Sequence, residues 1–566
     1  MTYPSSGEVV HEPTWFGPND GPLYGWLSIP MTSMVKGGVV LAPPVGFEAR
    51  GARRAFRALA TSLAESGYVA LRFDYRGTGD SSGDFGSALP NPKWLDDINT
   101  AVNYLRDCGI TSVSAVGMRL GATLVGVVAS RRQLDLDSFV AWDPCESGRS
   151  YLRELRALEN LRRTRPVELE GDAVETAEFR FSDEMANAVR SLDLSQSSPT
   201  TFAKRTLVMS RKNRPLSSRF RAHFEKGVVE FETTEEQEAL IDVPTFTATT
   251  PLITISRIVE WITNSAGTIP IAPRWNFHPE THLASSDGKS EIIERTMWLG
   301  PRKLFAIIDE SKEETLGPWI VLLGGINEDH TGPSRLWVEL SRRWAAAGLH
   351  CIRVDVSGMG ETPRCEDDPP MHIIDPVWTR DVHMVASIIS PADPSNCVYV
   401  GMCSGAFLAI EGAFGSGANG VCLVNPPPWT DYAHAITRLQ NMSWRLSHLI
   451  AKPLQFLFEK RPLIGAVLWR KIGAILPKRW AINVINEILL KGTVTLVLAG
   501  PEDLKSYART PILRLSKRAK SMLATPYQFI YVPELDHHLS SETGRERMRR
   551  ILEEDVQSRY GACQVL

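Results

Sequence analysis

The feature that most constrains the fold is a set of landmarks that occurs twice along the chain. A strand-like segment leads into Arg-x-Asp-x-x-Gly-x-Gly at 72–79, and the same pattern returns at 353–360, 281 positions later. A second segment, Gly-Met-x-x-Gly, stands at 117–121 and again at 401–405, 284 positions later. Because the offset is nearly constant and far longer than the period of a solenoid, the sequence predicts two domains of one design.

Each half of the chain is expected to alternate strands with helices. Strand-like apolar runs and amphipathic stretches follow one another in both halves. Such alternation is typical of a mostly parallel sheet with helices on both faces, so the predicted fold class is α/β. The expected strands lie at 23–28, 38–44, 69–75, 113–117, 319–325, 353–356 and 398–402, the expected helices at 55–66 and 94–108, and a hairpin that opens the second half at 291–298 and 303–308.

The length of the chain also requires more than one domain. At 566 residues it is too long for one ordinary hydrophobic core. A stretch that contains Pro, Ser and Gly at 264–289 is the expected linker, because such composition is typical of loops between domains. The predicted domains are therefore 1–263 and 290–566.

Composition and charge exclude several classes of protein. A net charge of −3 gives no signal for nucleic acid or for an acidic membrane surface as partner. The eight cysteines include no Cys-x-x-Cys pair, which argues against a disulfide framework and a zinc site. No dinucleotide fingerprint or phosphate loop occurs, so no cofactor or metal is expected. Without a signal peptide or a long apolar segment, the expected location is cytoplasmic and the chain is expected not to span a membrane.

The second copy of the Gly-Met-x-x-Gly segment has the layout of a nucleophile elbow. An apolar run of strand character leads into Gly401-x-Cys403-x-Gly405, and a run that can form a helix follows. Such a sharp strand-to-helix turn exposes a nucleophile above a parallel sheet. Cys403 occupies the central position, whereas Ser404 stands one place too late. Cys403 is therefore the predicted nucleophile.

Taken together, these motifs resemble the α/β-hydrolase superfamily in both halves, over residues 20–263 and 290–555. The Arg-x-Asp-x-x-Gly-x-Gly turn followed by the elbow carries the resemblance in each half. The segment Gly-Pro-x-Arg-Leu-Trp at 332–337 is also similar to hydrolases of bacterial biosynthetic clusters, including those at exosortase loci. The resemblance implies two tandem α/β-hydrolase domains that arose by duplication.

The resemblance implies an acid and a histidine after the nucleophile, in that chain order. The strand–Gly–x–x–Asp pattern of the family favours Asp503 as the acid, with Glu502 as a close rival. Asp-His is the common form of the family after the next strand, so His537 is preferred over His538. His537 would take the thiol proton, and Asp503 would orient the imidazole.

Other residues are expected to line the site. The backbone N–H of Ser404 is one expected donor to an oxyanion, and a second should come from the backbone near Gly325 or Ile326. His330, in the same loop, either lines the site or caps the loop. His538 and Trp444 are the remaining candidates for the lining of the site.

The first half lacks all three catalytic roles. Arg119 stands at the nucleophile position, and a guanidinium cannot act as a nucleophile. No acid occurs at 211–214, where the acid should follow a late strand, and no histidine occurs at 240–247. The first domain is therefore predicted to be a degenerate, non-catalytic copy. Arg119 either binds an anion such as a carrier phosphate or forms a structural salt bridge, and the salt bridge is the favoured interpretation.

The resemblance implies that a long insert at 426–491 forms a helical lid over the nucleophile. Its aromatic and aliphatic residues are interleaved with Lys and Arg. This composition suits an acyl chain delivered on coenzyme A or an acyl carrier protein. It equally suits a lid whose aromatic residues pack on the core and whose cations are solvated.

The resemblance permits two reactions at a cysteine elbow. Polyhydroxyalkanoate synthases use a similar elbow for acyl transfer, and dienelactone hydrolases use one for hydrolysis. Transfer of an acyl group from a carrier thioester or activated ester to a small-molecule amine or alcohol is favoured, in bacterial secondary metabolism or polysaccharide biosynthesis. Hydrolysis of an ester, lactone or thioester by the same triad is the alternative. A non-enzymatic binding or scaffold protein is a hypothesis of another class.

Overall fold

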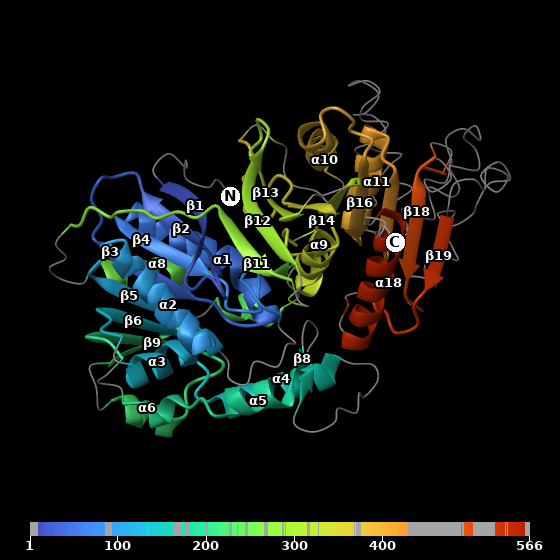
Figure 1. The fold of residues 1–566 in the computed structure, drawn as a ribbon. Helices are drawn as coiled ribbons and strands as arrows, with labels where there is room; N and C mark the ends of the chain where they lie inside the picture. The colour runs from blue at the N-terminus through green and yellow to red at the C-terminus, as the bar shows by residue number, and fades with distance from the viewer. Residues whose placement is uncertain are drawn as a thin grey trace, which may run out of the picture. The chain divides into compact units, whose positions relative to one another are not determined.

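The computed structural model forms two compact units, Met1–Thr281 and His282–Leu566. Each unit is an α/β structure with its own sheet (Figure 1). The structure describes residues 9–560 except 85–92, 133, 163–172, 176–179, 199–201, 226–228, 235, 244–246, 265–269, 286–287, 289, 314–316, 327, 367, 369–374, 428–487, 490–491, 502–526, 538 and 540.

The first unit is built on an eight-stranded sheet with the strand order β1-β2-β4-β3-β5-β6-β9-β10. The β1–β2 and β2–β4 pairs are antiparallel, and the remaining pairs are parallel. A two-stranded hairpin, β7–β8, is separate from this sheet. The strands are β1 (Val9–Phe16), β2 (Leu23–Pro30), β3 (Gly37–Ala42), β4 (Tyr68–Phe73), β5 (Val113–Met118), β6 (Ser138–Trp142), β7 (Val174–Glu175), β8 (Arg180–Phe181), β9 (Arg205–Arg211) and β10 (Val229–Thr234).

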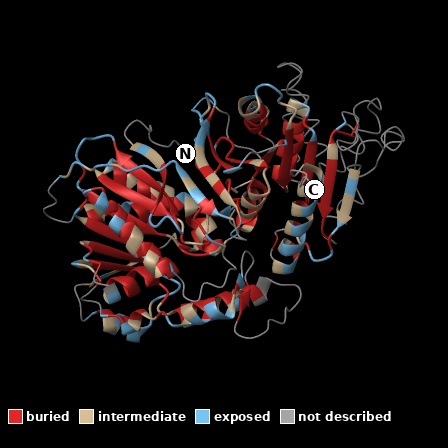
Figure 2. Ribbon diagram, in the orientation of Figure 1, coloured by how far each residue is buried: buried red, intermediate tan, exposed pale blue. Residues whose placement is uncertain are grey.

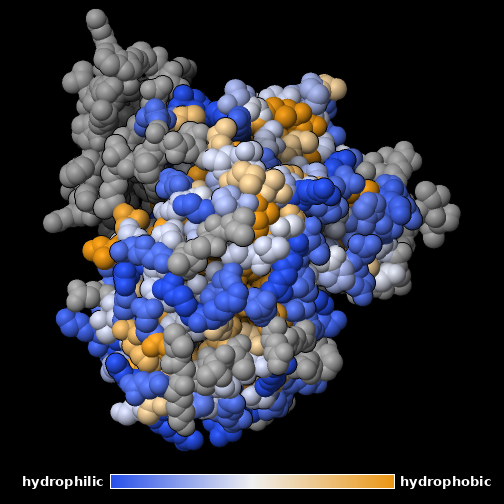
Figure 3. Space-filling model, turned by 90° about the vertical axis from the view of Figure 1, so that its left-hand side faces the viewer, coloured by the Kyte–Doolittle hydropathy of each residue, from blue (hydrophilic) through white to orange (hydrophobic). Residues whose placement is uncertain are grey.

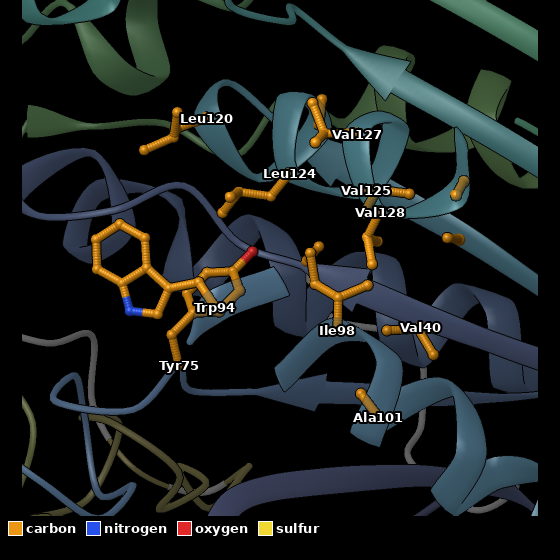
Figure 4. Packing of buried hydrophobic residues seen from close by; sticks show 14 of the residues in the cluster. Val40, Tyr75, Trp94, Ile98, Ala101, Leu120, Leu124, Val125, Val127 and Val128 are labelled. Carbon is orange, nitrogen blue, oxygen red and sulfur yellow. The ribbon is translucent and has the colours of Figure 1, made fainter. Parts of the chain in front are cut away.

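Successive side chains of a strand point to opposite faces of the sheet, and here the side chains on both faces are apolar. Helices therefore cover both faces. Val40 of β3 packs in a cluster with α2 and α3, while its neighbours Val39 and Leu41 pack in a cluster with α1 and α8. Figure 4 shows part of the first cluster, with Ile98 of α2 and Val128 of α3. The helices are α1 (Phe47–Glu65), α2 (Trp94–Asp107), α3 (Leu120–Arg132), α4 (Gly148–Arg162), α5 (Asp183–Arg190), η1 (Leu194–Gln196), α6 (Ser218–Phe224), α7 (Glu238–Ile241) and α8 (Leu252–Thr263).

The second unit is built on a nine-stranded sheet with the order β11-β12-β13-β15-β14-β16-β17-β18-β19. The β12–β13 and β13–β15 pairs are antiparallel, and the pairs from β15 through β14 to β19 are parallel. The strands are β11 (Glu280–Ala284), β12 (Glu291–Leu299), β13 (Leu304–Ser311), β14 (Trp319–Leu323), β15 (His350–Val354), β16 (Cys397–Met402), β17 (Gly420–Val424), β18 (Val494–Ala499) and β19 (Tyr527–Tyr531).

The helices of the second unit also pack on two faces of its sheet. Val321 and Leu323 of β14 share a cluster with α10 and α11, whereas Ile320 and Leu322 share one with α9 and α18. Figure 2 shows strands that are mostly buried and a helix α18 that alternates buried and exposed residues. The helices are η4 (Pro333–Arg335), α9 (Leu336–Ala346), α10 (Pro376–Ile389), α11 (Ser404–Ser416) and α18 (Glu542–Tyr560).

The two sheets share one connectivity over eight strands. The order from β12 to β19 repeats the order of the first sheet, with two antiparallel pairs followed by parallel ones. The predicted α/β class is confirmed, and so is the hairpin that opens the second half, which forms β12 and β13.

Two local predictions differ from the structure. Helix α1 begins at Phe47, eight residues before the predicted start. After Phe47 the buried positions of its first turns hold Glu48, Gly51 and Ala52, which give little apolar signal. The expected linker at 264–289 contains β11 and is also bound to the first unit. Ile271 forms a bridge with Val35 there, and the N–H of His278 donates to Thr14 Oγ1 at 2.9 Å.

One face of the surface is hydrophilic over most of its area, with hydrophobic groups in smaller separate areas (Figure 3). Among the residues that the structure describes, no helix combines the length and the apolar character that crossing a bilayer requires.

A buried carboxylate fixes the glycine turn after β4, and it predicts a pH dependence of stability. Asp97 accepts hydrogen bonds from the backbone N–H of Arg76 (2.9 Å) and from its Nε (2.8 Å). Burial raises the pKa of Asp97 to about 6, although Arg76 acts in the opposite direction. A pKa raised by folding means that protonation favours the folded state. The contribution of Asp97 to the free energy of unfolding is complete below about pH 4 and is lost as the pH rises through about 6. The difference between the two limits is about 3 kcal/mol. We therefore expect the free energy of unfolding, measured with urea from pH 4 to 7, to increase less on acidification in Asp97→Asn than in the unaltered protein.

Candidate functional site

Cys403 lies at a sharp turn between β16 and α11 in the second unit (Figure 1). Its backbone has φ 51° and ψ −121°, a strained conformation for a residue with a side chain. Its N–H donates to the carbonyl oxygen of Val424 at 3.0 Å, which ties the turn to the end of β17. The Cys403 side chain is half-buried, whereas Cys351, Cys397 and Cys422 are buried.

Both glycines of the elbow are required by close backbone contacts. A Cβ on Gly401 would lie 2.1 Å from the carbonyl oxygen of Gly405. A Cβ on Gly405 would lie 2.7 Å from the carbonyl oxygen of Leu323, at the end of β14. Only glycine at these two positions lets the start of α11 approach the ends of β14 and β16 so closely.

Replacing Gly405 with alanine is expected to displace the elbow. The new Cβ meets backbone atoms, so the strand or the helix must move, at a cost of about 1–3 kcal/mol. The displaced turn should also lower the rate of acylation at Cys403 by about 100-fold. Gly417→Ala is the matched control, because Gly417 has φ 71° but a Cβ added there would meet no atom within 4 Å. It should lose stability but keep the rate, and equal acylation rates in both variants would contradict the assigned role of Gly405.

Asn425 joins the loops that follow three neighbouring strands, and sequence reasoning missed it. It follows β17, has φ 42° and is fully buried. Its Nδ2 donates to the carbonyl oxygen of Asp536 at 3.2 Å, and its Oδ1 accepts from the N–H of Gly500 at 3.1 Å. The loop after β18 and the turn after β19 are thereby fixed beside the strand that accepts the Cys403 N–H. The sequence signal that could have identified Asn425 is a polar residue directly after a buried strand.

His537 lies in the turn after β19 and is partly exposed. It directly follows Asp536, whose carbonyl oxygen is held by Asn425. Cys403 packs against the apolar cluster that contains Leu535 and Leu539, on either side of His537. The structure therefore brings the turn that holds His537 and the turn that holds Cys403 to the same edge of the sheet.

Several predicted site residues lie outside the described residues. They are Asp503, its rival Glu502, His538 and Trp444, together with all but four residues of the expected lid at 426–491. The described chain reaches Pro501 after β18, so the segment that would carry the acid begins at the carboxyl edge of the sheet.

The expected oxyanion donors after β14 both have acceptors within the protein. The N–H of Gly325 donates to Glu328 Oε2 at 3.0 Å, and the N–H of Ile326 donates to Ser404 Oγ at 2.7 Å. Neither N–H points at open space in this conformation. The side chain of Ser404, rather than a substrate oxygen, receives the Ile326 donor.

His330 is buried at 2 % exposure and is bound by Asp355. Its Nδ1 lies 2.8 Å from Asp355 Oδ2, and its backbone N–H donates to Oδ1 at 2.6 Å. The ring also packs edge-on against Phe305, with centroids 5.0 Å apart. These contacts fit the loop-capping alternative for His330.

In the first unit, Arg119 occupies the elbow position with φ 53° and is 2 % exposed. Its guanidinium pairs with Glu48 at 2.9 Å, Glu154 at 2.7 Å and Asp143 at 3.5 Å. Burial raises the pKa of Glu48 and of Asp143, while ion pairing lowers that of Glu154. Three carboxylates therefore compensate Arg119, as the salt-bridge interpretation requires.

A cavity of about 280 Å³ lies beside this cluster in the first unit. It is lined by Phe47, Glu154, Leu158, Arg211, Asn213, Arg214, Ile241 and Asp242. The lining charges are paired with one another, since Arg211 binds Asp242 at 2.6 Å and Arg214 binds Glu154.

Within the described part of the chain, no group of three or more His, Cys, Asp or Glu side chains is arranged to hold a metal ion. The seven described cysteines are free thiols.

Comparison with known proteins agrees with this geometry for the second unit. Residues 320–553 match the model of the Alpha/beta hydrolase family. Together with the strand order, this match supports an α/β-hydrolase fold and enzyme chemistry of the hydrolase type in that unit. No curated protein matches the sequence.

Three similar solved structures each correspond to less than half of this chain. Est1E from Butyrivibrio proteoclasticus with ferulic acid bound is 15% identical, with 44% of this chain and 97% of that chain covered and a TM-score of 0.34. The esterase Pf2001 from Pyrococcus furiosus is 16% identical, with 46% and 94% covered and a TM-score of 0.33. Carboxyl esterase 2 from Tuber melanosporum is 17% identical, with 47% and 90% covered and a TM-score of 0.32.

Proposed function

We propose that the second unit is a cysteine-dependent acyltransferase that works through an acyl thioester on Cys403. The observation that carries the proposal is the backbone of Cys403, a non-glycine residue held at φ 51° between β16 and α11. Such strain is retained where the surrounding structure enforces it and a side chain must be presented. The half-buried thiol is reachable, unlike the buried thiols of the same sheet.

His537 is the proposed base, and Asp503 is the proposed acid that orients it. The imidazole takes the thiol proton, and the sulfur attacks the carbonyl carbon of the donor. The tetrahedral oxyanion then collapses and expels the carrier thiolate, which takes the proton from the imidazolium. An amine or alcohol attacks the enzyme thioester in the second half of the reaction and regenerates the Cys403 thiol.

The proposed donor is an acyl thioester of coenzyme A or of an acyl carrier protein, or an activated ester. Exchange of one thioester for another conserves the activation of the acyl group, so little free energy is lost before the acceptor attacks. A small-molecule amine or alcohol is the proposed acceptor, in cytoplasmic secondary metabolism or polysaccharide biosynthesis. Hydrolysis is the second candidate, because the family model that matches 320–553 describes hydrolases.

The first unit is proposed to be a non-catalytic copy that arose by duplication. The shared strand order and the positive φ of both Arg119 and Cys403 support a common origin. Its elbow holds a neutralised ion cluster, so its role is structural rather than chemical.

The test is the intact mass of the full chain after mixing with a panel of acyl thioesters. An acyl increment that persists in buffer and disappears when an amine or alcohol is added would identify a transferase. An increment that water removes at the same rate, with or without an acceptor, would establish the hydrolase instead. No increment with any donor, while iodoacetamide still labels Cys403, would favour the non-enzymatic binding or scaffold protein.

A further inference from the structure

The hydroxyl of Ser404 is placed between the loop after β14 and the nucleophile. Ser404 directly follows Cys403, is the first residue of α11 and is 2 % exposed. Its Oγ accepts the N–H of Ile326 at 2.7 Å, a short bond for this type of donor. The neighbouring N–H of Gly325 is bound by Glu328. The loop therefore delivers the Ile326 donor to the side chain of Ser404.

A serine hydroxyl is both an acceptor and a donor. The acceptor side of Ser404 Oγ is used by Ile326, whereas its proton has no acceptor among the described residues of the chain. A hydroxyl proton rotates freely about the Cβ–Oγ bond, so it can turn toward any acceptor that comes within reach. Its oxygen is polarised by the bond that it accepts, which strengthens the bond that it can donate.

We propose that the Ser404 hydroxyl is a catalytic donor that stabilises the oxyanion formed at Cys403, with Ile326 behind it in a hydrogen-bond relay. The inference rests on the proposed function. It adds a residue that the usual pair of backbone donors does not include, because in this chain the loop N–H acts through the serine. The N–H of Ser404, at the start of α11, is the other donor.

The relay matters only while negative charge is on the substrate oxygen. When the Cys403 sulfur bonds to the carbonyl carbon, the π electrons move to the oxygen, and the hydroxyl proton of Ser404 hydrogen-bonds to it. When the carbonyl re-forms, the leaving group departs with its electron pair and this hydrogen bond weakens. Donors that strengthen only in the transition state raise the rate of the chemical step.

The experiment compares two reactions of Cys403 in the full chain. Acylation by p-nitrophenyl acetate forms an oxyanion and releases p-nitrophenolate, whereas alkylation by iodoacetamide displaces iodide and forms none. Ser404→Ala should slow acylation by about 100-fold and leave the alkylation rate unchanged. Ser404→Thr and Ser404→Val form a second pair of nearly equal shape, and only the threonine variant should retain acylation.

Other outcomes would overturn the inference. Faster acylation in Ser404→Ala would show that the hydroxyl blocks the Ile326 donor, and equal slowing of both reactions would show a structural role in the elbow. Equal acylation in the threonine and valine variants would also contradict it. If the unaltered protein is alkylated at Cys403 but never acylated, the proposed function fails together with the inference. If it is acylated at a rate that does not depend on Ser404, the inference alone fails.

Discussion

Cys403→Ala is expected to abolish the acyl increment and to lower any turnover by at least about 10⁴-fold, because no other group replaces a lost nucleophile. Mass spectrometry of the peptide around residue 403 locates the adduct, and the release of the leaving group gives the rate. The fold should survive, since alanine is smaller than cysteine and the elbow is shaped by Gly401 and Gly405.

Cys365→Ala is the matched control for this prediction. Cys365 is an exposed free thiol in the same unit, so it should react with iodoacetamide without taking part in acylation. Removing it should leave the acyl adduct and the rate unchanged. An adduct that persists in Cys403→Ala and disappears in Cys365→Ala would reject Cys403 as the nucleophile.

Burial separates Cys403 from the other thiols around the sheet. Burial raises the pKa of Cys397 to about 12, and it raises those of Cys351 and Cys422 further. Such thiols stay protonated near neutral pH and react slowly with electrophiles. A chemical probe should therefore distinguish Cys403 from these three residues without mutagenesis.

The elements with a strong local pattern could be predicted from the sequence. Apolar runs such as Val113–Met118 are fully buried strands, and the amphipathic helix expected at 94–108 is observed at Trp94–Asp107. Strand β11 could not be predicted, because its pattern of exposed and partly buried residues carries little apolar signal. Its place in the sheet depends on pairing with β12, which local sequence does not encode.

The same limit applies to the candidate site. The turn around Cys403 is local. Its two glycines and the patterns of the flanking strand and helix can therefore be read from the sequence. The bond from Ile326 to Ser404 joins residues 78 positions apart, and that from Asn425 to Asp536 spans 111 positions. Such contacts depend on how strand ends meet at one edge of the sheet. The sequence therefore predicted only that the backbone near Gly325 or Ile326 would donate to the oxyanion, and it gave no role to Asn425.

Arg119→Met is expected to destabilise the first unit by about 3–5 kcal/mol and to leave acylation of Cys403 unchanged. The substitution removes the ion pair of the buried Glu48 carboxylate, whereas Asp143 keeps Arg211 at 2.9 Å. Breaking a buried ion pair on one side costs this much. Urea unfolding of the full chain measures the loss, and p-nitrophenyl acetate measures the rate.

Lys204→Met separates this effect from the general loss of a positive charge. Lys204 pairs with Asp137 at 2.6 Å, but its side chain is 67% exposed, so its removal should cost at most about 1 kcal/mol.

The loss of stability in Arg119→Met should also shrink as the pH falls from 8 to 5. Burial already raises the pKa of Glu48 and Asp143, and without Arg119 these groups take up protons more readily in the folded state. A loss as small as that of Lys204→Met, or a lost acylation rate, would show that Arg119 has a role other than neutralising this cluster. The expected result would show that Arg119 stabilises its own unit through this ion cluster.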